Sequence, residues 1–457
     1  PGGTGLEWCD AEVLRMVRRR SLARLRREVE PVPSTALARF VPAWQGIGTR
    51  ASRGVDGVLR AVEQLAGVPL PASALESLVL PSRVVDYAPG LLDELTLAGE
   101  VVWTGAGSIP GNDGWLVLAP TDAAALLLPP ANPLTDAVAD ALLTALQPGT
   151  AVFFRTLADC VPDASDSDIA AAVWELVWGG ALTNDTLAPV RARLGARAAH
   201  PPRRRPPRTR YARYGGLSGV PAAALARGTP HAMGGRWSRL PAGEADPTRR
   251  ALATADALLD RYGVVTRGAV GAERVAGGFA AVYPVLKAAD ESGRARRGYF
   301  VDGLGAAQFA VPGAVDRLRA QARPDELRQP AATQVLAATD PANVYGAALP
   351  WPQAQAPDAR GGRGHQPARK AGALVVLVDG ACVLYVERGG RTLLSFADDP
   401  ALLQPAADAL ALAVRDGVLG KLAVERADGA PIVASPLGDA LEAAGFRPTP
   451  RGLRLRG

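Results

Sequence analysis

The sequence predicts an α+β protein in which three similar units, each of three helices and two strands, precede a β-rich module. Three observations support this fold class. A helical pattern of apolar residues that ends at a glycine and leads into a strand occurs three times. Beyond residue 331 the apolar pattern changes from the period of helices to that of strands. The length of 457 residues suffices for several domains, each with its own core.

The repeated units are recognised by three glycines, Gly99, Gly180 and Gly293. An apolar residue lies four positions before each glycine, one helical turn away on the same face, and another lies two positions after it. Glycine ends a helix at low cost because it adopts positive φ readily. Three helices and two strands with a glycine between them predict a winged helix, the helix-turn-helix variant with a β-hairpin wing. The threefold repetition strengthens this prediction.

The N-terminal residues 1–54 are expected to form a basic helical segment, with a helix over 10–30. Its arginines either contact nucleic acid or form a solvated face beside a neighbouring domain. The patterns further along the chain predict winged helices at residues 55–119, 133–189 and 240–323, with a linker rich in Arg, Pro and Gly at residues 190–239.

Positive charge is concentrated in two stretches of the chain. Residues 190–214 contain nine Arg and no acidic residue, and residues 446–457 contain four more Arg, again without an acid. Elsewhere the acidic residues outnumber the basic ones. Any electrostatic attraction to nucleic acid is therefore local. Within the linker the arginines either bind phosphate without sequence preference or keep the segment soluble.

Residues 331–399 are predicted to form a β-barrel-like module. Two β-rich runs within 373–387 meet at Asp379 and Gly380, a type I′ hairpin sequence, and residues 392–396 add a third strand. Closing such apolar strands on themselves would leave no exposed edge. Residues 400–457 alternate between helix and strand and are expected to form an α/β tail.

Several kinds of site are excluded by what the sequence lacks. No apolar run is long enough for a membrane helix, and no signal peptide is visible. Cys9, Cys160 and Cys382 lie too far apart in sequence for a zinc motif, and they argue against a disulfide framework. We therefore expect no metal site and a cytoplasmic location.

The motifs of an ATP-driven motor are also missing. A phosphate-binding loop ends in Gly-Lys-Ser or Gly-Lys-Thr, whereas the one Gly-Lys pair, Gly420-Lys421, is followed by Leu. We therefore expect this chain to need no cofactor and to hydrolyse no ATP by itself. Because the chain begins at Pro1 rather than Met, it is expected to be part of a longer polypeptide.

Segments along nearly the whole chain resemble bacterial Lhr (large helicase-related) proteins. They are Trp8–Asp10, Arg18–Val32, Leu37–Gly46, Gly235–Ser238, Asp246–Arg250, Arg261–Val270, Gly277–Tyr283, Arg297–Phe309 and Ala337–Pro352. The resemblance implies the C-terminal portion of a superfamily 2 ATP-dependent DNA helicase that acts in DNA repair, with ATP and Mg²⁺ bound by the motor of the same polypeptide. It also implies a homo-oligomer, for which we predict a tetramer, and similarity to AlkZ-type DNA glycosylases.

The resemblance implies uracil as the base that such a glycosylase would remove. A glycosylase needs a carboxylate or amide that positions water at the sugar. AlkZ-like enzymes carry a Gln–apolar–Gln pair, which Gln353 and Gln355 match in letters, although they lie in a Pro-rich loop. Asp379 is better explained by its hairpin turn. Asp302 lies in a well-matched segment, but a turn explains it too. These four residues are weak catalytic candidates.

The third winged helix offers the clearest surface for nucleic acid, most plausibly single-stranded DNA. Aromatic and cationic residues lie together on its third helix and its wing, a combination suited to base stacking and phosphate contact. Equally, the two aromatic residues could be core residues at helical spacing. The candidates are Phe279, Tyr283, Lys287, Arg294, Arg296, Arg297 and Arg267.

The first two winged helices differ from the third. Their third helices carry Asp93, Glu94 and Glu175 beside Trp174 and Trp178, which are poor surfaces for phosphate. We expect these two units to serve as protein interfaces or spacers.

Overall fold

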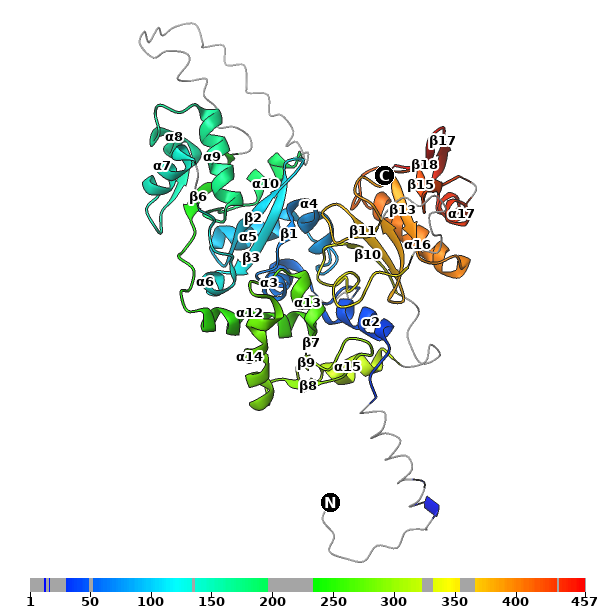
Figure 1. Cartoon of the computed structure of the whole chain (residues 1–457). Coiled ribbons are helices and arrows are strands. Elements are labelled where there is room, and N and C mark those ends of the chain that lie inside the picture. Colours follow the sequence, from blue (N-terminus) through cyan, green and yellow to red (C-terminus); the bar gives the residue numbers. More distant parts are fainter. Residues whose placement is uncertain are drawn as a thin grey trace, which may run out of the picture.

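The computed structural model describes residues 30–48, 52–133, 136–195, 233–322, 332–353, 366–433 and 435–456, together with residues 12, 13 and 16. The helix predicted over 10–30 lies almost entirely outside the described residues. Figure 1 shows the first winged helix at the centre, the second at the upper left, the third below and the C-terminal sheet at the right.

The first unit contains a winged helix whose third helix, α5, ends at Gly99 as predicted. Gly99 has a φ of 75°, and the chain then enters the wing strands β2 and β3. The sheet order is β1-β3-β2. The elements are α2 (Ser34–Trp44), α3 (Gly54–Leu65), β1 (Leu70–Pro71), α4 (Ala72–Ala74), the π-helix η1 (Leu75–Val79), α5 (Pro89–Ala98), β2 (Val101–Ile109), β3 (Asp113–Pro120) and α6 (Ala124–Leu127).

The second unit is also a winged helix, and its wing corrects the predicted linker at 190–239. The strand β6 lies within that range but is the central strand of this sheet, in the order β4-β6-β5, and its Trp237 is fully buried. The linker prediction failed because β6 returns to its partner only after the Arg-rich insertion. The elements are α7 (Ala137–Ala145), β4 (Ala151–Phe153), α8 (Phe154–Asp159), α9 (Asp166–Trp178), β5 (Leu182–Asn184), α10 (Ala188–Arg193) and β6 (Arg236–Arg239).

The third unit has the same plan, with a three-stranded sheet in the order β7-β9-β8. Gly293, with a φ of 76°, separates α14 from the wing strand β8, again as predicted. The elements are α12 (Pro247–Tyr262), β7 (Val264–Val265), α13 (Arg267–Ala272), α14 (Gly278–Glu291), β8 (Arg296–Gly298), β9 (Gln308–Ala310) and α15 (Ala314–Ala320).

The C-terminal region is built on a six-stranded sheet in the order β10-β11-β12-β13-β15-β16 and a smaller sheet in the order β14-β18-β17. Asp379 and Gly380 have φ values of 49° and 81°, which confirms the type I′ turn. The elements are β10 (Thr333–Ala337), β11 (Leu374–Val378), β12 (Ala381–Val386), β13 (Thr392–Ser395), α16 (Pro400–Arg415), β14 (Leu422–Val424), β15 (Arg426–Ala427), β16 (Ala430–Pro431), α17 (Pro436–Ala443), β17 (Arg447–Thr449) and β18 (Gly452–Leu455).

The barrel-like part of the prediction is not confirmed, because the described strands form no closed barrel and β10 and β16 end the six-stranded sheet. Alternate residues of β11 face opposite sides of the sheet. Val376 and Val378 pack in the cluster that includes α16, whereas Val375 and Leu377 pack in the cluster that includes α2. Other elements thus cover both faces, which removes the need for the sheet to close on itself.

The helix α2 connects distant parts of the chain. It packs against α12 and α15 of the third winged helix. Arg39 of α2 also donates to the backbone oxygens of Asp379, at 2.8 Å, and Gln321, at 3.0 Å. A segment that precedes the first winged helix therefore joins the third one to the β-sheet (Figure 1). Within the described residues, no helix has the length and apolar character that a membrane crossing would require.

Candidate nucleic-acid interface

The helix α14 occupies the position of the recognition helix in the third winged helix. Its start follows from two glycines, Gly277 and Gly278, which have φ values of 73° and 61° and let the chain turn sharply into the helix. Val282, Leu286 and Ala289 form its buried face at spacings of four and three residues. The opposite face, with Lys287, is exposed.

The aromatic pair on α14 is half-buried rather than displayed as a free platform. Phe279 and Tyr283 have ring centroids 5.6 Å apart, and Tyr283 meets the buried ring of Phe309 edge-on at 5.9 Å. Both pack against the hydrophobic core of this unit. The guanidinium of Arg297 lies 5.8 Å from the Tyr283 ring centroid. These rings therefore support the core, and their part in binding stays a prediction.

The predicted cations lie along the exposed edge of the same unit. Arg296 and Arg297 are exposed on the wing strand β8. Two others form ion pairs, Arg294 with Asp256 at 3.0 Å and Lys287 with Glu291 at 3.5 Å. All four of these paired side chains are about half exposed or more, so each pair contributes little to stability and can exchange its carboxylate for a phosphate.

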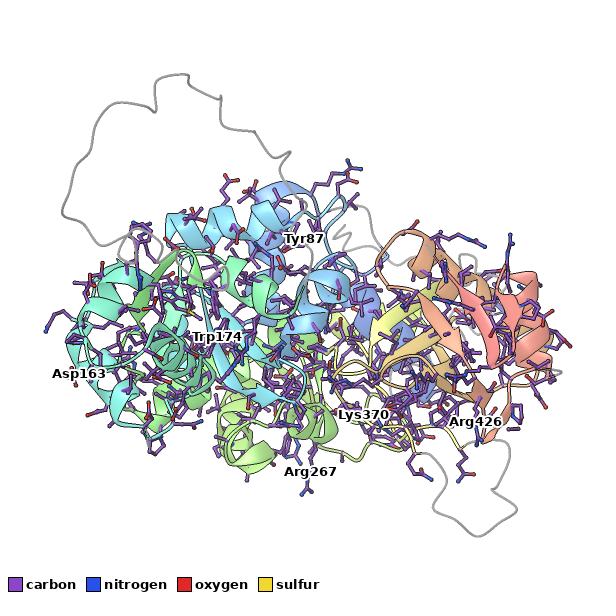
Figure 2. All side chains as sticks on the ribbon, turned by 90° about the horizontal axis from the view of Figure 1, so that it is seen from above. Tyr87, Asp163, Trp174, Arg267, Lys370 and Arg426 are labelled. Atoms are coloured by element: carbon purple, nitrogen blue, oxygen red, sulfur yellow. The ribbon has the colours of Figure 1, made fainter. Side chains whose placement is uncertain are left out.

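Arg267 lies apart from that edge. It is the first residue of α13, is exposed, and points away from the body of the protein in Figure 2. The structure thus brings six of the seven predicted binding residues to α14 and the wing, and places the seventh on the preceding helix.

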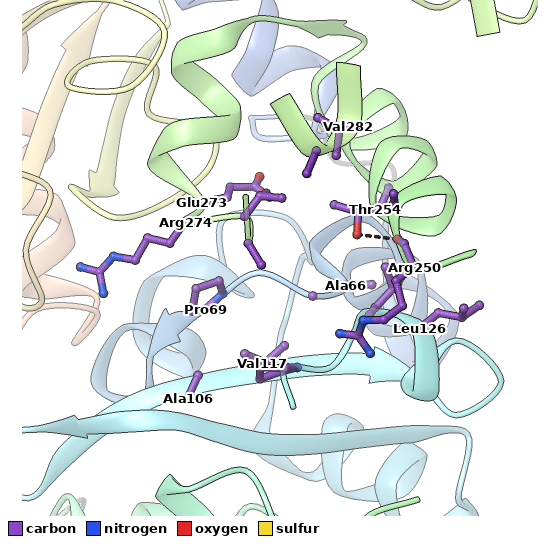
Figure 3. Close-up of a pocket in the computed structure, with 18 of the residues that line it drawn as sticks. Ala66, Pro69, Ala106, Val117, Leu126, Arg250, Thr254, Glu273, Arg274 and Val282 are labelled. Atoms are coloured by element: carbon purple, nitrogen blue, oxygen red, sulfur yellow. Dashed lines mark hydrogen bonds between the residues drawn. The ribbon is translucent and has the colours of Figure 1, made fainter. Parts of the chain in front are cut away.

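A hollow of about 450 Å³, which no sequence pattern indicated, lies between the first and third winged helices. Figure 3 shows its walls, with Ala106 and Val117 on the wing of the first unit and Val282 on α14. Most of the lining is apolar. The polar or aromatic lining residues are Trp115, Arg250, Thr254, Arg261, Glu273 and Arg274.

The polar residues of the hollow are held in defined positions. The guanidinium of Arg250 donates to the backbone oxygens of Ala125 at 3.0 Å and Leu128 at 2.8 Å. The guanidinium of Arg274 lies over the indole of Trp115, 5.0 Å from its centroid. Arg274 has a φ of 56°, a conformation that non-glycine residues seldom adopt and that is enriched at functional sites.

Glu273 is bound by a buried arginine. Nη1 of Arg261 donates to both carboxylate oxygens of Glu273, at 2.7 and 2.5 Å, and the same guanidinium donates to the backbone oxygens of Gln64 and Ala66. Through these bonds Arg261 joins the third winged helix to the first. Burial, together with the negative charge of Glu273, raises the pKa of the neighbouring Tyr262 well above its ordinary value.

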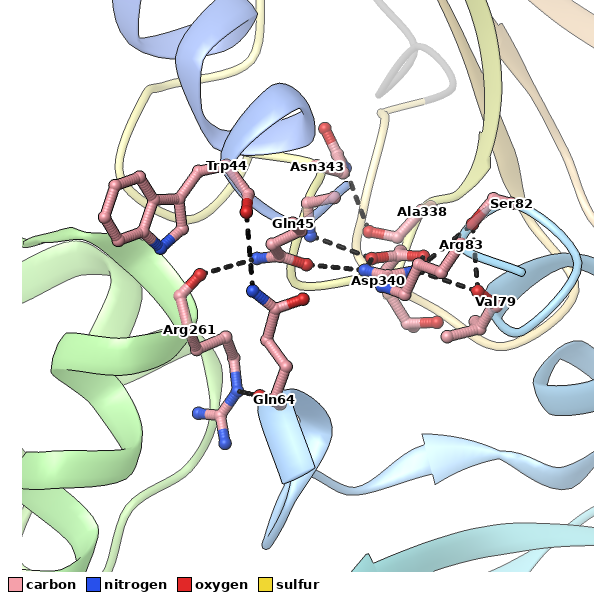
Figure 4. Close-up of polar contacts among 12 residues, drawn as sticks. Trp44, Gln45, Gln64, Val79, Ser82, Arg83, Arg261, Ala338, Asp340 and Asn343 are labelled. Carbon is pink, nitrogen blue, oxygen red and sulfur yellow. Dashed lines mark hydrogen bonds and ion pairs between the residues drawn. The ribbon is translucent and has the colours of Figure 1, made fainter. Parts of the chain in front are cut away.

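A second buried polar network lies beside α2 (Figure 4). Arg83, which follows the π-helix η1, forms a bidentate pair with Asp340 at 2.7 and 3.0 Å. Their side chains are 2% and 1% exposed, respectively. Arg83 also donates to the side-chain oxygen of Gln45 at 2.5 Å, and Gln45 donates to the backbone oxygen of Arg261 at 3.2 Å.

The turn that carries Asp340 is fixed by further buried groups. Asn343 donates to the backbone oxygen of Ala338 at 3.0 Å. The guanidinium of Arg369 donates to three carbonyls of the same turn, those of Thr339, Asp340 and Asn343. Burial lowers the pKa of Arg369 below its ordinary value. The network thus joins α2, the first winged helix and the C-terminal sheet, which is a scaffolding role.

The catalytic candidates do not come together. Asp379 lies in its hairpin turn and pairs with Arg39 at 3.2 Å. Asp302 accepts a hydrogen bond from the hydroxyl of Tyr299 at 2.6 Å in an exposed turn. Gln353 is exposed in a loop, and Gln355 lies outside the described residues. Among the residues with described positions, no three His, Cys, Asp or Glu side chains are grouped as metal ligands would be.

Acidic side chains of the first winged helix form ion pairs with an arginine of the second one. Arg191 of α10 pairs with Glu76 at 2.6 Å and with Asp93 of α5 at 2.7 Å. Burial alone would lower the pKa of Arg191, but its bonds to the two carboxylates raise it above the ordinary value. Trp178 of α9 packs directly on the wing of the first unit, where a glycine, Gly114, leaves it room. These contacts join the first two units to each other, and their expected role as protein interfaces or spacers stays a prediction.

Two segments of the chain match models of one protein family. A family model described as "Large helicase-related protein, winged-helix domain" matches residues 32–121, and a second model with this description matches residues 244–330. These are Lhr winged-helix domains. The first match begins before α2, so the Lhr domain includes the helix that contacts the third unit.

Two curated Lhr relatives match nearly the whole chain. The "Lhr helicase/ probable uracil glycosylase" of Mycolicibacterium smegmatis is 49% identical over 99% of this chain, and the "Lhr helicase/uracil glycosylase" of Escherichia coli is 37% identical over 98%. The chain spans 30% of the length of each relative. The resemblance to Lhr proteins that the sequence motifs indicated is thereby confirmed.

The fold of this chain is also similar to that of a solved structure. Streptomyces sahachiroi DNA glycosylase AlkZ superposes with a TM-score of 0.50 over 87% of this chain and 100% of that chain, at 15% sequence identity. At this identity the likeness concerns the fold.

Proposed function

We propose that this chain is the nucleic-acid-binding C-terminal region of an Lhr-type helicase and that the third winged helix supplies the binding surface. The observation that carries the proposal is the set of exposed cations on α14 and β8, the recognition helix and wing of that unit. Within the first unit, by contrast, the acids Glu76 and Asp93 are engaged by Arg191. The names of the relatives contain the words helicase and uracil glycosylase, and these are activities on nucleic acid, which supports DNA as the ligand.

Charge reversal of Arg294, Arg296 and Arg297 to Glu is expected to weaken binding to single-stranded DNA by about tenfold or more, whatever the base sequence. Each lost phosphate contact lowers the slope of log affinity against log salt by about 0.7, so the triple variant should have a slope smaller by about 2. Fluorescence anisotropy with a labelled oligonucleotide across a salt series measures both quantities.

The matched control reverses three exposed arginines outside the third winged helix, Arg53, Arg60 and Arg239. This variant changes the net charge equally but should retain the affinity and salt slope of the unaltered chain to within about twofold, since nonlocal charge is screened. Equal losses in the two variants would mean that net charge, not this surface, determines binding.

A second function, DNA glycosylase activity, is favoured by the comparisons. The names of the two curated relatives include "probable uracil glycosylase" and "uracil glycosylase", and AlkZ shares the fold over its whole length. We also propose, as the Lhr resemblance implies, that the complete polypeptide contains a helicase motor, forms a homo-oligomer and lies in the cytoplasm. Size-exclusion chromatography with light scattering tests the oligomer: a strict monomer at micromolar concentration would contradict it.

The glycosylase proposal is tested by incubating the chain in excess with single-stranded DNA that contains one uracil, followed by alkali. Cleavage at the uracil position is expected, and its absence at enzyme excess would contradict the proposal. Asp302→Asn is the informative variant, because Asp302 is exposed and paired only locally with Tyr299, so that a lost activity would reflect chemistry rather than unfolding. A strand with thymine in place of uracil is the control substrate.

A further inference from the structure

The hollow between the first and third winged helices is open, sized for a small ligand and adjacent to the proposed binding helix. Its volume of about 450 Å³ lies within the range of about 300–1,000 Å³ of small-molecule sites. Val275 and Ala276, which precede α14, and Ala281 and Val282, which belong to it, form one wall. The helix α14 therefore carries both a wall of the hollow and one of the proposed binding cations, Lys287.

We propose that this hollow receives one unpaired nucleobase from nucleic acid bound to α14. The inference rests on the proposed function and adds a base-binding site to it. Proteins hold an extruded base between aromatic and apolar side chains and read its edge with hydrogen bonds. Both requirements are met by the lining of the hollow.

The planar groups come from Trp115 and Arg274. Trp115 is half-buried on β3, and the guanidinium of Arg274 lies over its ring, 5.0 Å from the indole centroid. Aromatic rings and arginine guanidinium groups are the side-chain groups on which bases stack in single-strand binding proteins. Apolar lining comes from Pro69, Val117 and Leu126, among others.

Hydrogen-bonding groups of both kinds face the same space. Arg250 uses two of its five N–H groups for the carbonyls of Ala125 and Leu128, which fixes the guanidinium while further donors remain in its plane. The hydroxyl of Thr254 donates to the backbone oxygen of Arg250 at 2.8 Å, so its oxygen keeps acceptor capacity. A donor and an acceptor side by side match the edge of a base. Figure 3 shows Arg250 and Thr254 close to each other in the lining of the hollow.

The test compares three DNA duplexes of the same sequence: fully paired, with one bulged 2-aminopurine, and with an abasic bulge at the same position. The chain should bind the bulged base about fivefold or more tightly than the abasic bulge, because stacking on an aromatic residue is lost with the base. Binding should also quench the 2-aminopurine emission. Trp115→Ala should reduce the affinity ratio to about one and abolish the quenching.

A second variant and a control guard against a loss of folding. Ala251→Leu extends an apolar side chain into the hollow from α12 and should also remove the preference, whereas Phe153→Ala, which truncates an aromatic side chain that is 61% exposed on the second unit, should keep it. Equal binding of all three duplexes by the unaltered chain, or a preference that persists in both pocket variants, would overturn the base site and leave the proposed function intact. No binding to any duplex or to single-stranded DNA would overturn both.

Discussion

Replacing Arg83 with alanine is expected to lower the free energy of unfolding by about 3–5 kcal/mol. The substitution leaves Asp340 as an unpaired carboxylate whose side chain is only 1% exposed. It also removes the donor to Gln45, a buried side chain that depends on Arg83 for its oxygen. Urea unfolding followed by circular dichroism measures the change.

A double variant separates the charge from the packing. Asp340→Asn removes the buried charge but keeps the shape, and its side-chain oxygen can still accept from the backbone N–H of Ala342, as Asp340 does at 2.8 Å. The variant with both Arg83→Ala and Asp340→Asn should therefore be more stable than Arg83→Ala alone, a coupling that a double-mutant cycle quantifies. Arg60→Ala, at an exposed position of α3, is the control and should change stability by less than about 0.5 kcal/mol. A loss below about 1 kcal/mol for Arg83→Ala would contradict the assigned role of the network.

Trp237→Ala is expected to destabilise the second winged helix by about 3–5 kcal/mol, the cost of truncating a large core side chain. Trp237 is fully buried on β6, between β4 and β5, and its ring meets Trp174 edge-on at 6.1 Å. Because hydrogen exchange reports stability amide by amide, exchange at the amides of β4 and β5 is the suitable measurement. Exchange there should be faster by about two orders of magnitude or more.

The control for Trp237 lies two residues further along the same strand. Arg239→Ala should leave the exchange rates nearly unchanged, since Arg239 is exposed and sheet hydrogen bonds belong to the backbone. If Trp237→Ala had no more effect than Arg239→Ala, residues 236–239 would behave as the linker that the sequence predicted, and the strand assignment would be wrong.

The parts of the fold that the sequence predicted are those with local signals. Gly99, Gly180 and Gly293 each end a helix with positive φ, a property of the residue itself that requires no knowledge of distant partners. The Asp379-Gly380 turn is similar, since its conformation follows from its two residues. Local backbone preference was therefore sufficient for the helix ends of the three units and for the hairpin.

The parts that sequence patterns missed depend on contacts between distant residues. Arg83 and Asp340 are 257 residues apart, and nothing in either neighbourhood indicates the other. β6 could not be paired with β5 from sequence because an Arg-rich insertion separates them. The barrel was predicted because α2, which covers one face of the sheet, is remote in sequence: its last residue, Trp44, lies 289 residues before Thr333, the first residue of the sheet.

The same limit applies to the candidate site. The cations of α14 and β8 could be named because they are neighbours in sequence. The hollow could not, since Trp115 comes from the first unit and Arg250 and Arg274 from the third. Of its residues, only Arg274 carried a structural anomaly, a positive φ at a non-glycine position, and that becomes visible in three dimensions alone.

The wing of the second unit has a consequence for how relatives of this chain can diverge. β5 and β6 are adjacent antiparallel strands, so the chain leaves the sheet after Asn184 and returns at Arg236 beside the point of departure. The two ends of that excursion stay together whatever its length, and doubling a long loop costs only about 0.6 kcal/mol. Selection can therefore lengthen, shorten or replace the sequence inserted between α10 and β6 while the sheet keeps its register, so this position can acquire new sequence without a change in the fold.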